Sequence, residues 1–248
     1  MLWLKPVGEV DDPLAPYLVP RGAHHDRPYV LANMVSGLDG RAAVTGRVGV
    51  LSTPADARLF LELRSVADIV LVGAHTVRQE RYGPVRLADH LRDARLRGGR
   101  PATPRIAVVT RTLDFDWSIP LFSSAAPESR PLLITSEAVA PDRIREAQMH
   151  ADVVVAGRVS VDLREALGRL KDDGAAVVLC EGGPTLLGAL AAGDLLDELC
   201  LTVTPVMGGD PLPLSLVPSG TSLAWFSLAH VLSDESSLFL RYERSAER

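Results

Sequence analysis

The segment Val177–Leu187 reads VVLCEGGPTLL and joins an apolar run to two glycines, a proline and a threonine. Short apolar runs of this kind are typical of buried strands, and proline is favoured in the first turn of a helix. The segment therefore predicts a strand that turns directly into a helix. The first N–H groups of such a helix lack intrahelical partners, so they suit a phosphate or pyrophosphate. A tight turn that binds nothing is the alternative, because the dinucleotide fingerprint with three glycines is absent.

Strands and helices alternate along the chain before this turn. We expect helices to begin at Ser52–Asp56, with its hydroxyl cap, proline and early acid, and near Ala74, and another to span Val161–Asp173. The expected strands are apolar runs at Tyr29–Met34, Asp68–Gly73, Arg105–Thr110, Pro131–Thr135, Val153–Ala156 and Ala176–Cys180. Apolar strands that alternate with helices predict an α/β fold with a mostly parallel sheet and helices on both faces.

The last part of the chain has a different character. Leu199–Val206, Leu223–Leu232 and Ser237–Tyr242 read as strands with no helices between them. We therefore expect antiparallel strands at the C-terminal edge of the sheet. The arginine-rich segment Arg86–Pro104 is interpreted as a solvated loop, with contact to a phosphate or a partner as the alternative.

Length and composition limit the class of protein. A chain of 248 residues is long enough for one large domain with a buried core. No apolar run approaches the roughly 20 residues of a membrane-spanning helix, and Met1–Asp12 lacks the pattern of a secretory signal. We expect a soluble, cytoplasmic protein that does not bind membranes. The net charge of −5 argues against general binding to nucleic acids.

The cysteines and the paired histidines are assigned no chemistry. Cys180 and Cys200 lie in apolar segments and are interpreted as reduced core residues rather than a disulfide or a metal pair. His24 and His25 have no metal-ligand partners at helical spacing and are interpreted as surface residues. No metal site is expected.

Charged residues near the predicted turn are candidates for a binding site. Glu181 follows the strand, where a carboxylate could accept hydrogen bonds from N–H groups of a substrate ring or relay a proton; a solvent-facing glutamate is the alternative. Arg64 ends a predicted helix, which basic residues favour in any case, and Arg86 lies in a later loop. Together they could hold a phosphate monoester by bidentate contacts.

Five ordered blocks of residues resemble a known family. They are Asn33–Arg41 (NMVSGLDGR), Leu51–Asp56 (LSTPAD), Val72–Glu80 (VGAHTVRQE), Glu181–Leu186 (EGGPTL), and Asp197–Leu199 with Pro205–Gly209 (PVMGG). Through these blocks the chain resembles the reductase domain of the bifunctional deaminase-reductase of riboflavin biosynthesis, and its stand-alone relatives, from about Pro28 to Tyr242. The chain lacks the His-x-Glu and Pro-Cys-x-x-Cys pairing of a zinc deaminase.

The resemblance implies a dihydrofolate-reductase-like domain over residues 28–248, preceded by an extension over residues 1–27. It also implies NADPH as hydride donor, a homodimer, and a phosphorylated pyrimidine as substrate. In the family, the ribosyl group of 5-amino-6-(5-phosphoribosylamino)uracil, or of its diamino-pyrimidinone counterpart, is reduced to a ribityl chain by hydride transfer to C1′. A reductase of dihydrofolate or another pterin, and a non-catalytic protein that binds NADPH, are the alternatives.

Matching positions carry the family's roles to residues of this chain. The substrate would be bound by Asn33, Val48, Arg64, Arg86 and Glu181, and Asp39, Glu181 or water would donate the proton. The cofactor would be bound by Ser36, Val50, Gly73, Thr76, Glu80, Gly182, Gly183, Pro184, Thr185 and Leu186. Because a 2′-phosphate needs a cation or hydroxyl nearby, Thr110 and Arg111 are our candidates for that contact, and Gly157 could contribute to the same site.

Three positions depart from the family pattern. Asn33 stands where many bifunctional members have lysine, and in this it is similar to the stand-alone reductases. Val48 stands where a substrate-contacting serine is frequent, and Gly37 replaces a common serine. These departures bear on which pyrimidine, or which pterin, is the substrate.

Overall fold

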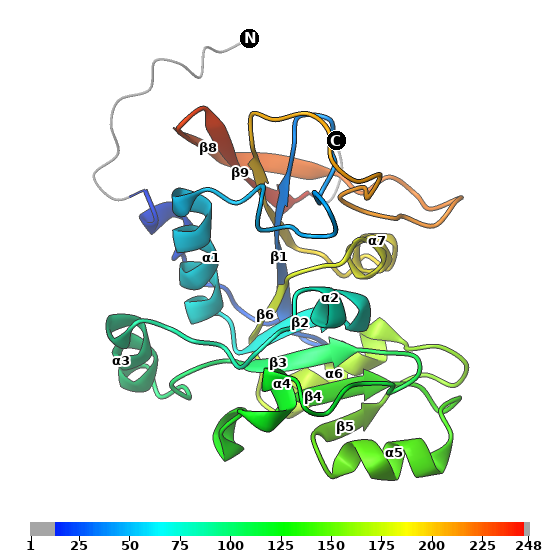
Figure 1. Ribbon diagram of the computed structural model, residues 1–248. Coiled ribbons are helices and arrows are strands. Elements are labelled where there is room, and N and C mark those ends of the chain that lie inside the picture. The colour runs from blue at the N-terminus through cyan, green and yellow to red at the C-terminus, as the bar shows by residue number, and fades with distance from the viewer. Residues whose placement is uncertain (1–12, 246–248) are drawn as a thin grey trace.

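A single sheet organises the chain in the computed structural model, which describes residues 13–245 (Figure 1). Within these residues the sheet has nine strands in the order β5-β4-β3-β2-β6-β1-β7-β9-β8. The strands are β1 (Tyr29–Ser36), β2 (Ile69–Gly73), β3 (Arg105–Val109), β4 (Leu132–Thr135), β5 (Asp152–Val155), β6 (Val177–Cys180), β7 (Glu198–Val203), β8 (Phe226–Asp234) and β9 (Ser237–Arg244).

The direction of the strands confirms the predicted fold class. Every pairing from β5 across to β7 is parallel, and β7–β9 and β9–β8 are antiparallel. The antiparallel strands form the C-terminal edge, at the top of Figure 1. β6 enters between β2 and β1 although it follows β5 in the chain, so the carboxyl ends of these three strands lie side by side.

Helices cover both faces of the sheet. They are α1 (Pro54–Val66), α2 (Ala74–Gln79), α3 (Asp89–Arg97), α4 (Pro120–Ser123), α5 (Pro141–Gln148), α6 (Leu163–Asp172) and α7 (Pro184–Ala192), with short 3-10 turns η1 (Ala15–Tyr17) and η2 (Pro127–Ser129). Apolar residues of α1, α2, α3 and α5 pack on one face, whereas those of α6 and α7 pack on the other. None of the helices between residues 13 and 245 is long and apolar enough to cross a bilayer.

The start of α1 follows its sequence. Thr53 is the N-cap and accepts a hydrogen bond from the backbone N–H of Asp56 at 3.2 Å, and Pro54 occupies the first turn. The Asp56 carboxylate is buried. It accepts hydrogen bonds from Ser52 Oγ at 2.5 Å and from Thr202 Oγ1 at 2.6 Å, which replace those that water would make. This carboxylate therefore joins the first turn of α1 to β7.

The prediction of a solvated loop over Arg86–Pro104 is wrong, because Asp89–Arg97 forms α3. Arg95 is 1% exposed, and its guanidinium donates to the backbone carbonyls of Ser65, Ala67 and Pro101. It thereby satisfies carbonyl groups where α1 ends, which have no intrahelical partner. The charged Arg95 side chain can therefore be buried, because carbonyl groups at the end of α1 accept its hydrogen bonds.

Most strands begin or end one or two residues away from the expected bounds, and the differences are largest in β7 and β8. β7 stops at Val203, ahead of Pro205, which has no N–H to donate to a neighbouring strand. β8 begins at Phe226 rather than Leu223 and extends to Asp234. The two cysteines are free and buried, as predicted.

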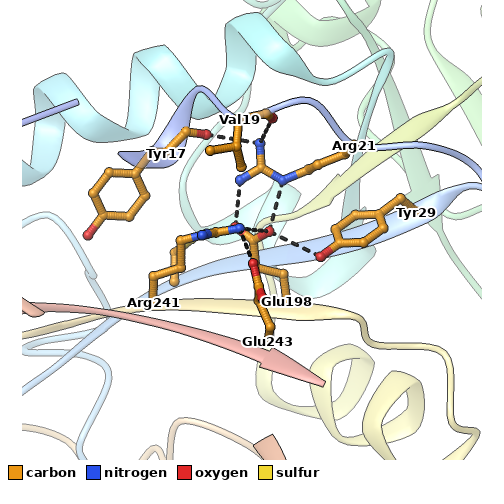
Figure 2. A network of polar contacts seen from close by, with 8 residues as sticks. Tyr17, Val19, Arg21, Tyr29, Glu198, Arg241 and Glu243 are labelled. Carbon is orange, nitrogen blue, oxygen red and sulfur yellow. Dashed lines mark hydrogen bonds and ion pairs between the residues drawn. The ribbon is translucent and has the colours of Figure 1, made fainter. Parts of the chain in front are cut away.

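The described part of the N-terminal extension packs against the domain that follows. Leu14 and Tyr17 belong to the same core as α1 and β2. Arg21 donates to the Glu198 carboxylate at 2.6 Å and 2.9 Å (Figure 2), and Arg27 donates to Asp197 at 2.6 Å and 2.8 Å. The division at residue 28 stays a prediction, and Met1–Asp12 lies outside the described residues.

Candidate active site

A cavity of about 940 Å³ opens beside the carboxyl ends of β1 and β6. Its walls come from the loop after β1, the inner side of α1, and α2 with the loop that follows it. Nine of the residues predicted for the site line it: Asn33, Val48, Arg64, Thr76, Glu80, Arg86, Glu181, Gly183 and Pro184. The carboxyl edge of an open parallel sheet is where ligands of such folds usually bind.

Glu181 lies in this cavity with its carboxylate held from two sides. Arg64 donates from Nε to Oε1 at 2.6 Å and from Nη2 to Oε2 at 2.8 Å. The Tyr82 hydroxyl donates to Oε2 at 2.8 Å. Because Glu181 is only 8% exposed, it is not the solvent-facing glutamate that we considered as the alternative.

Arg64 is the charged partner of Glu181 and is itself enclosed. Its guanidinium carbon lies 4.1 Å from the centre of the Phe60 ring, and Phe60 is one helical turn earlier on α1. Burial by itself would lower the pKa of Arg64, but the hydrogen bonds and the charge of Glu181 raise it above its ordinary value. Arg64 therefore stays charged, and its Nη1 makes no hydrogen bond within residues 13–245.

Tyr82 is a hydrogen-bond donor that the sequence analysis did not assign to the site. Burial raises the pKa of its hydroxyl well above the ordinary value, and the charge of Glu181 raises it further. The hydroxyl therefore keeps its proton and donates it to a hydrogen bond with the carboxylate. Because Tyr82 lies between two predicted site residues, Glu80 and Arg86, its place in the chain was the available signal.

Asn33 contributes an amide with an unused acceptor. The residue is 8% exposed, lines the cavity from β1, and its Oδ1 has no hydrogen-bond partner among the described residues. Buried polar atoms in folded proteins are nearly always hydrogen-bonded. An unpartnered oxygen at a cavity wall therefore indicates a ligand with an N–H or O–H group.

Glycines bring the turns after β2 and β6 into contact. Gly73 N–H donates to the Gly182 carbonyl at 2.8 Å, and these turns lead into α2 and α7. A Cβ added to Gly183 would lie 2.9 Å from Thr76 Oγ1, so the backbone and this side chain meet without room for a methyl group. Gly183 is the N-cap of α7, and no side chain of the described residues caps this helix start. The start of α7 thus offers backbone N–H groups beside the cavity.

Glu80 and Val48 connect α2 to the loop after β1. The Val48 N–H donates to Glu80 Oε1 at 3.1 Å, and both residues line the cavity. Arg86 lines the cavity as an exposed residue and makes no ion pair within residues 13–245. A phosphate group at this end of the cavity would therefore meet a cation that no carboxylate neutralises.

Other predicted residues lie outside the cavity wall. They are Ser36, Asp39, Val50, Gly73, Thr110, Arg111, Gly157, Gly182, Thr185 and Leu186. The Asp39 carboxylate accepts hydrogen bonds from the N–H groups of Gly208 and Arg41, and these, led by Gly208, lower its pKa. Asp39 thus ties two loops together, and a role as proton donor stays a prediction.

The candidates for the 2′-phosphate lie farther along the same sheet edge. Arg111 is exposed just after β3, and Thr110 Oγ1 accepts from the backbone N–H of Leu113 at 3.3 Å. β3 lies next to β2, about 5 Å away at the usual strand spacing. Gly157 follows β5 at the far edge, where its N–H donates to Glu165 Oε2 at 2.8 Å. The roles of these residues stay predictions.

The chain is an α/β protein with a dihydrofolate-reductase-like fold and a cavity at the carboxyl ends of its parallel strands. More particularly, the chain belongs to the RibD C-terminal domain family, whose model matches residues 28–239. It is 33% identical over 183 residues to the 2,5-diamino-6-ribosylamino-4(3H)-pyrimidinone 5′-phosphate reductase of Methanothermobacter thermautotrophicus, covering 74% of this chain and 80% of the relative. It is 30% identical over 190 residues to the protein of that name from Archaeoglobus fulgidus, covering 75% and 85%.

A solved structure agrees with this assignment. The pyrimidine reductase-like protein of Corynebacterium diphtheriae superposes with a TM-score of 0.80 at 27% identity, covering 96% of each chain. The match extends over nearly the whole chain, so it includes the antiparallel edge as well as the parallel part of the sheet. The predicted fold and family are therefore confirmed.

Proposed function

We propose that this protein uses NADPH to reduce the ribosyl group of 2,5-diamino-6-ribosylamino-4(3H)-pyrimidinone 5′-phosphate to a ribityl chain, as a step of riboflavin biosynthesis. The observation that carries the proposal is the Glu181 carboxylate, buried at the end of β6 inside a cavity that also holds Asn33, Arg64 and Arg86. The archaeal relatives at 33% and 30% identity carry the name of this activity.

A dinucleotide would lie along the turns beside the cavity. Gly183 allows the start of α7 to approach Thr76 closely, and the helix start would hold the pyrophosphate with backbone N–H groups. Thr110 and Arg111, one strand beyond β2, would receive the ribose 2′-phosphate, which favours NADPH over NADH. When bound, a nicotinamide would supply the hydride, and the chain's own residues would orient the substrate toward it.

The pyrimidine and its phosphate would lie along the other wall. Arg86, together with the Nη1 of Arg64, would hold the 5′-phosphate. Asn33 Oδ1 would accept a hydrogen bond from an amino or ring N–H of the pyrimidine, because this oxygen has no partner among the described residues. An amide can accept from the 2-amino group of the diamino-pyrimidinone, which a lysine ammonium cannot do. The uracil also has N–H groups, so the name that the archaeal relatives carry is what favours the diamino-pyrimidinone.

Reduction at C1′ requires the sugar in its open, imine form. With the imine nitrogen protonated, hydride would add to C1′ and the electron pair of the C=N bond would move to nitrogen, which gives the neutral amine. Glu181 would face the substrate as a carboxylate and stabilise the positive charge of the protonated imine. Because its two oxygens already accept hydrogen bonds from Arg64 and Tyr82, Glu181 needs no rearrangement to do so.

The experiment is an assay of purified protein with the diamino-pyrimidinone, the uracil and dihydrofolate in parallel, followed by loss of NADPH absorbance. We expect rapid oxidation with the diamino-pyrimidinone and a loss of kcat of about 100-fold or more in E181Q. Oxidation of NADPH with the uracil instead would identify the uracil as the substrate. Oxidation of NADPH with dihydrofolate alone would show that the protein is a pterin reductase. Binding of NADPH without turnover would show a non-catalytic protein.

We also propose that the protein is a homodimer, as its family resemblance implies. The edge strand β8 supports this proposal, since it has β9 on one side and no further strand of the described chain on the other. Exposed apolar residues occur on β8 and before it, including Leu228 at 44% and Leu223 at 78% exposure. An edge of this kind is suited to a second copy of the chain.

A further inference from the structure

We propose that Tyr82 is a positioning residue that, together with Arg64, fixes the Glu181 carboxylate in a single orientation for reduction. The inference rests on the proposed function and assigns a role to a residue outside the five family blocks. It concerns three side chains that come from α1, the loop after α2, and the end of β6.

The backbone around Tyr82 holds this side chain in place. Arg81 has a φ of +46°, a left-handed conformation that few residues other than glycine adopt, and it turns the chain sharply after α2. The Tyr82 N–H then donates to the Val77 carbonyl at 3.2 Å, and the Tyr82 carbonyl accepts from Leu121 N–H at 3.1 Å. With the backbone fixed on both sides, the ring projects toward Glu181.

The hydroxyl and the guanidinium share the carboxylate between them. Oε1 accepts from Arg64 Nε at 2.6 Å, whereas Oε2 accepts from both Arg64 Nη2 and Tyr82 Oη at 2.8 Å. Two donors from different segments restrict rotation of the Glu181 carboxylate about its last side-chain bond more than a single donor would. Because burial raises the pKa of the Tyr82 hydroxyl, this group remains a donor over the working pH range.

Preorganised groups stabilise the transition state more than the bound substrate, so a positioning residue acts on kcat rather than on binding. Loss of the hydroxyl would leave the ring and the Arg64 ion pair, but Oε2 would lose one of its two donors. Loss of the Tyr82 hydroxyl should therefore lower kcat when residue 181 is glutamate, but not when it is glutamine.

The test compares Tyr82→Phe with a matched control. In Y82F we expect kcat to fall about tenfold or more, with KM for the pyrimidine and Kd for NADPH within about twofold of wild type. Tyr29→Phe is the control, because it removes another hydroxyl that donates to a buried glutamate, Glu198 at 3.2 Å, outside the cavity wall. We expect Y29F to keep the kcat of wild type.

The double variant Y82F/E181Q separates positioning from general weakening of the fold. If Tyr82 acts through Glu181, the effects are non-additive, so Y82F changes kcat less than about twofold in the E181Q background. A kcat of Y82F near that of wild type, or a full additional loss in the double variant, would overturn the inference. Absence of turnover in the wild type with each pyrimidine would instead overturn the proposed function on which it rests.

Discussion

Close approach of two backbone segments is decided by single glycines in this protein. At Gly183 an added Cβ would lie 2.9 Å from Thr76 Oγ1, and at Gly182 it would lie 3.2 Å from Met34 Cε. Gly182 also has a φ of +85°, which side chains other than glycine rarely adopt. These two positions keep the turn after β6 against α2 and β1, where we propose that the dinucleotide binds.

Replacement of Gly183 with alanine is therefore expected to weaken NADPH binding. The new methyl group must displace Thr76 or the start of α7, and we expect Kd for NADPH to rise about tenfold, which is ~1.4 kcal/mol. Isothermal titration calorimetry measures this change. Gly22→Ala is the control, since no atom of residues 13–245 lies within 4 Å of an added Cβ there. An unchanged Kd in G183A would contradict the placement of the cofactor at this turn.

At the scale of elements, a buried ion-pair network joins the N-terminal segment to the antiparallel edge. Figure 2 shows Glu198 of β7 between Arg21 and Arg241, with Tyr29 close to the same carboxylate. Glu198 is 0% exposed. Burial by itself would raise the pKa of Glu198, but hydrogen bonds and charges from Arg21 and Arg241 outweigh it and lower the pKa to about 2.

This network predicts a large loss of stability in E198Q. The variant removes the carboxylate that two buried guanidinium groups share and leaves Arg241 only the half-exposed Glu243, so we expect the unfolding free energy at about pH 7 to fall by about 3 kcal/mol. Because the folded pKa lies below the ordinary value of 4.5, the stabilisation is present above that pH and is lost as pH falls toward about 2. Urea denaturation across this range should show the difference from wild type shrinking in acid.

An exposed carboxylate supplies the control for this prediction. Asp152 pairs with Arg105 and Arg130, but its side chain is 52% exposed. Solvent screens such pairs, so D152N should cost less than about 1 kcal/mol. Equal losses of unfolding free energy in D152N and E198Q would show that burial does not increase the contribution of the Glu198 network to stability.

At the scale of the whole molecule, the edge of the sheet predicts self-association. Light scattering should give a mass of about twice the 26.6 kDa of the chain. A charge placed on the exposed edge strand by Leu228→Glu should convert the protein to monomers, because a like charge would then face itself across a twofold interface. Leu96→Glu on α3 is the control at a comparably exposed leucine. A monomeric wild type would contradict the proposed dimer.

The kinds of elements and much of the ligand-binding edge could be predicted from local patterns along the chain. Apolar runs and helix starts predicted the parallel strands and the glycine turn after Cys180, because these signals depend on neighbours along the chain. The five blocks identified the family, which the match over residues 28–239 confirmed. Nine predicted site residues, Glu181 among them, do line one cavity.

Contacts between distant residues, in contrast, could not be predicted before the packing of the elements was known. The insertion of β6 between β2 and β1 places Glu181 beside Arg64, which lies 117 positions earlier, and beside Tyr82, 99 positions earlier. α3 formed in a segment predicted as a loop, because Arg95 finds its acceptors at the end of α1. A local sequence pattern indicates the period of a helix or strand. A contact between distant segments depends on how the elements pack, and that packing cannot be predicted from any one segment.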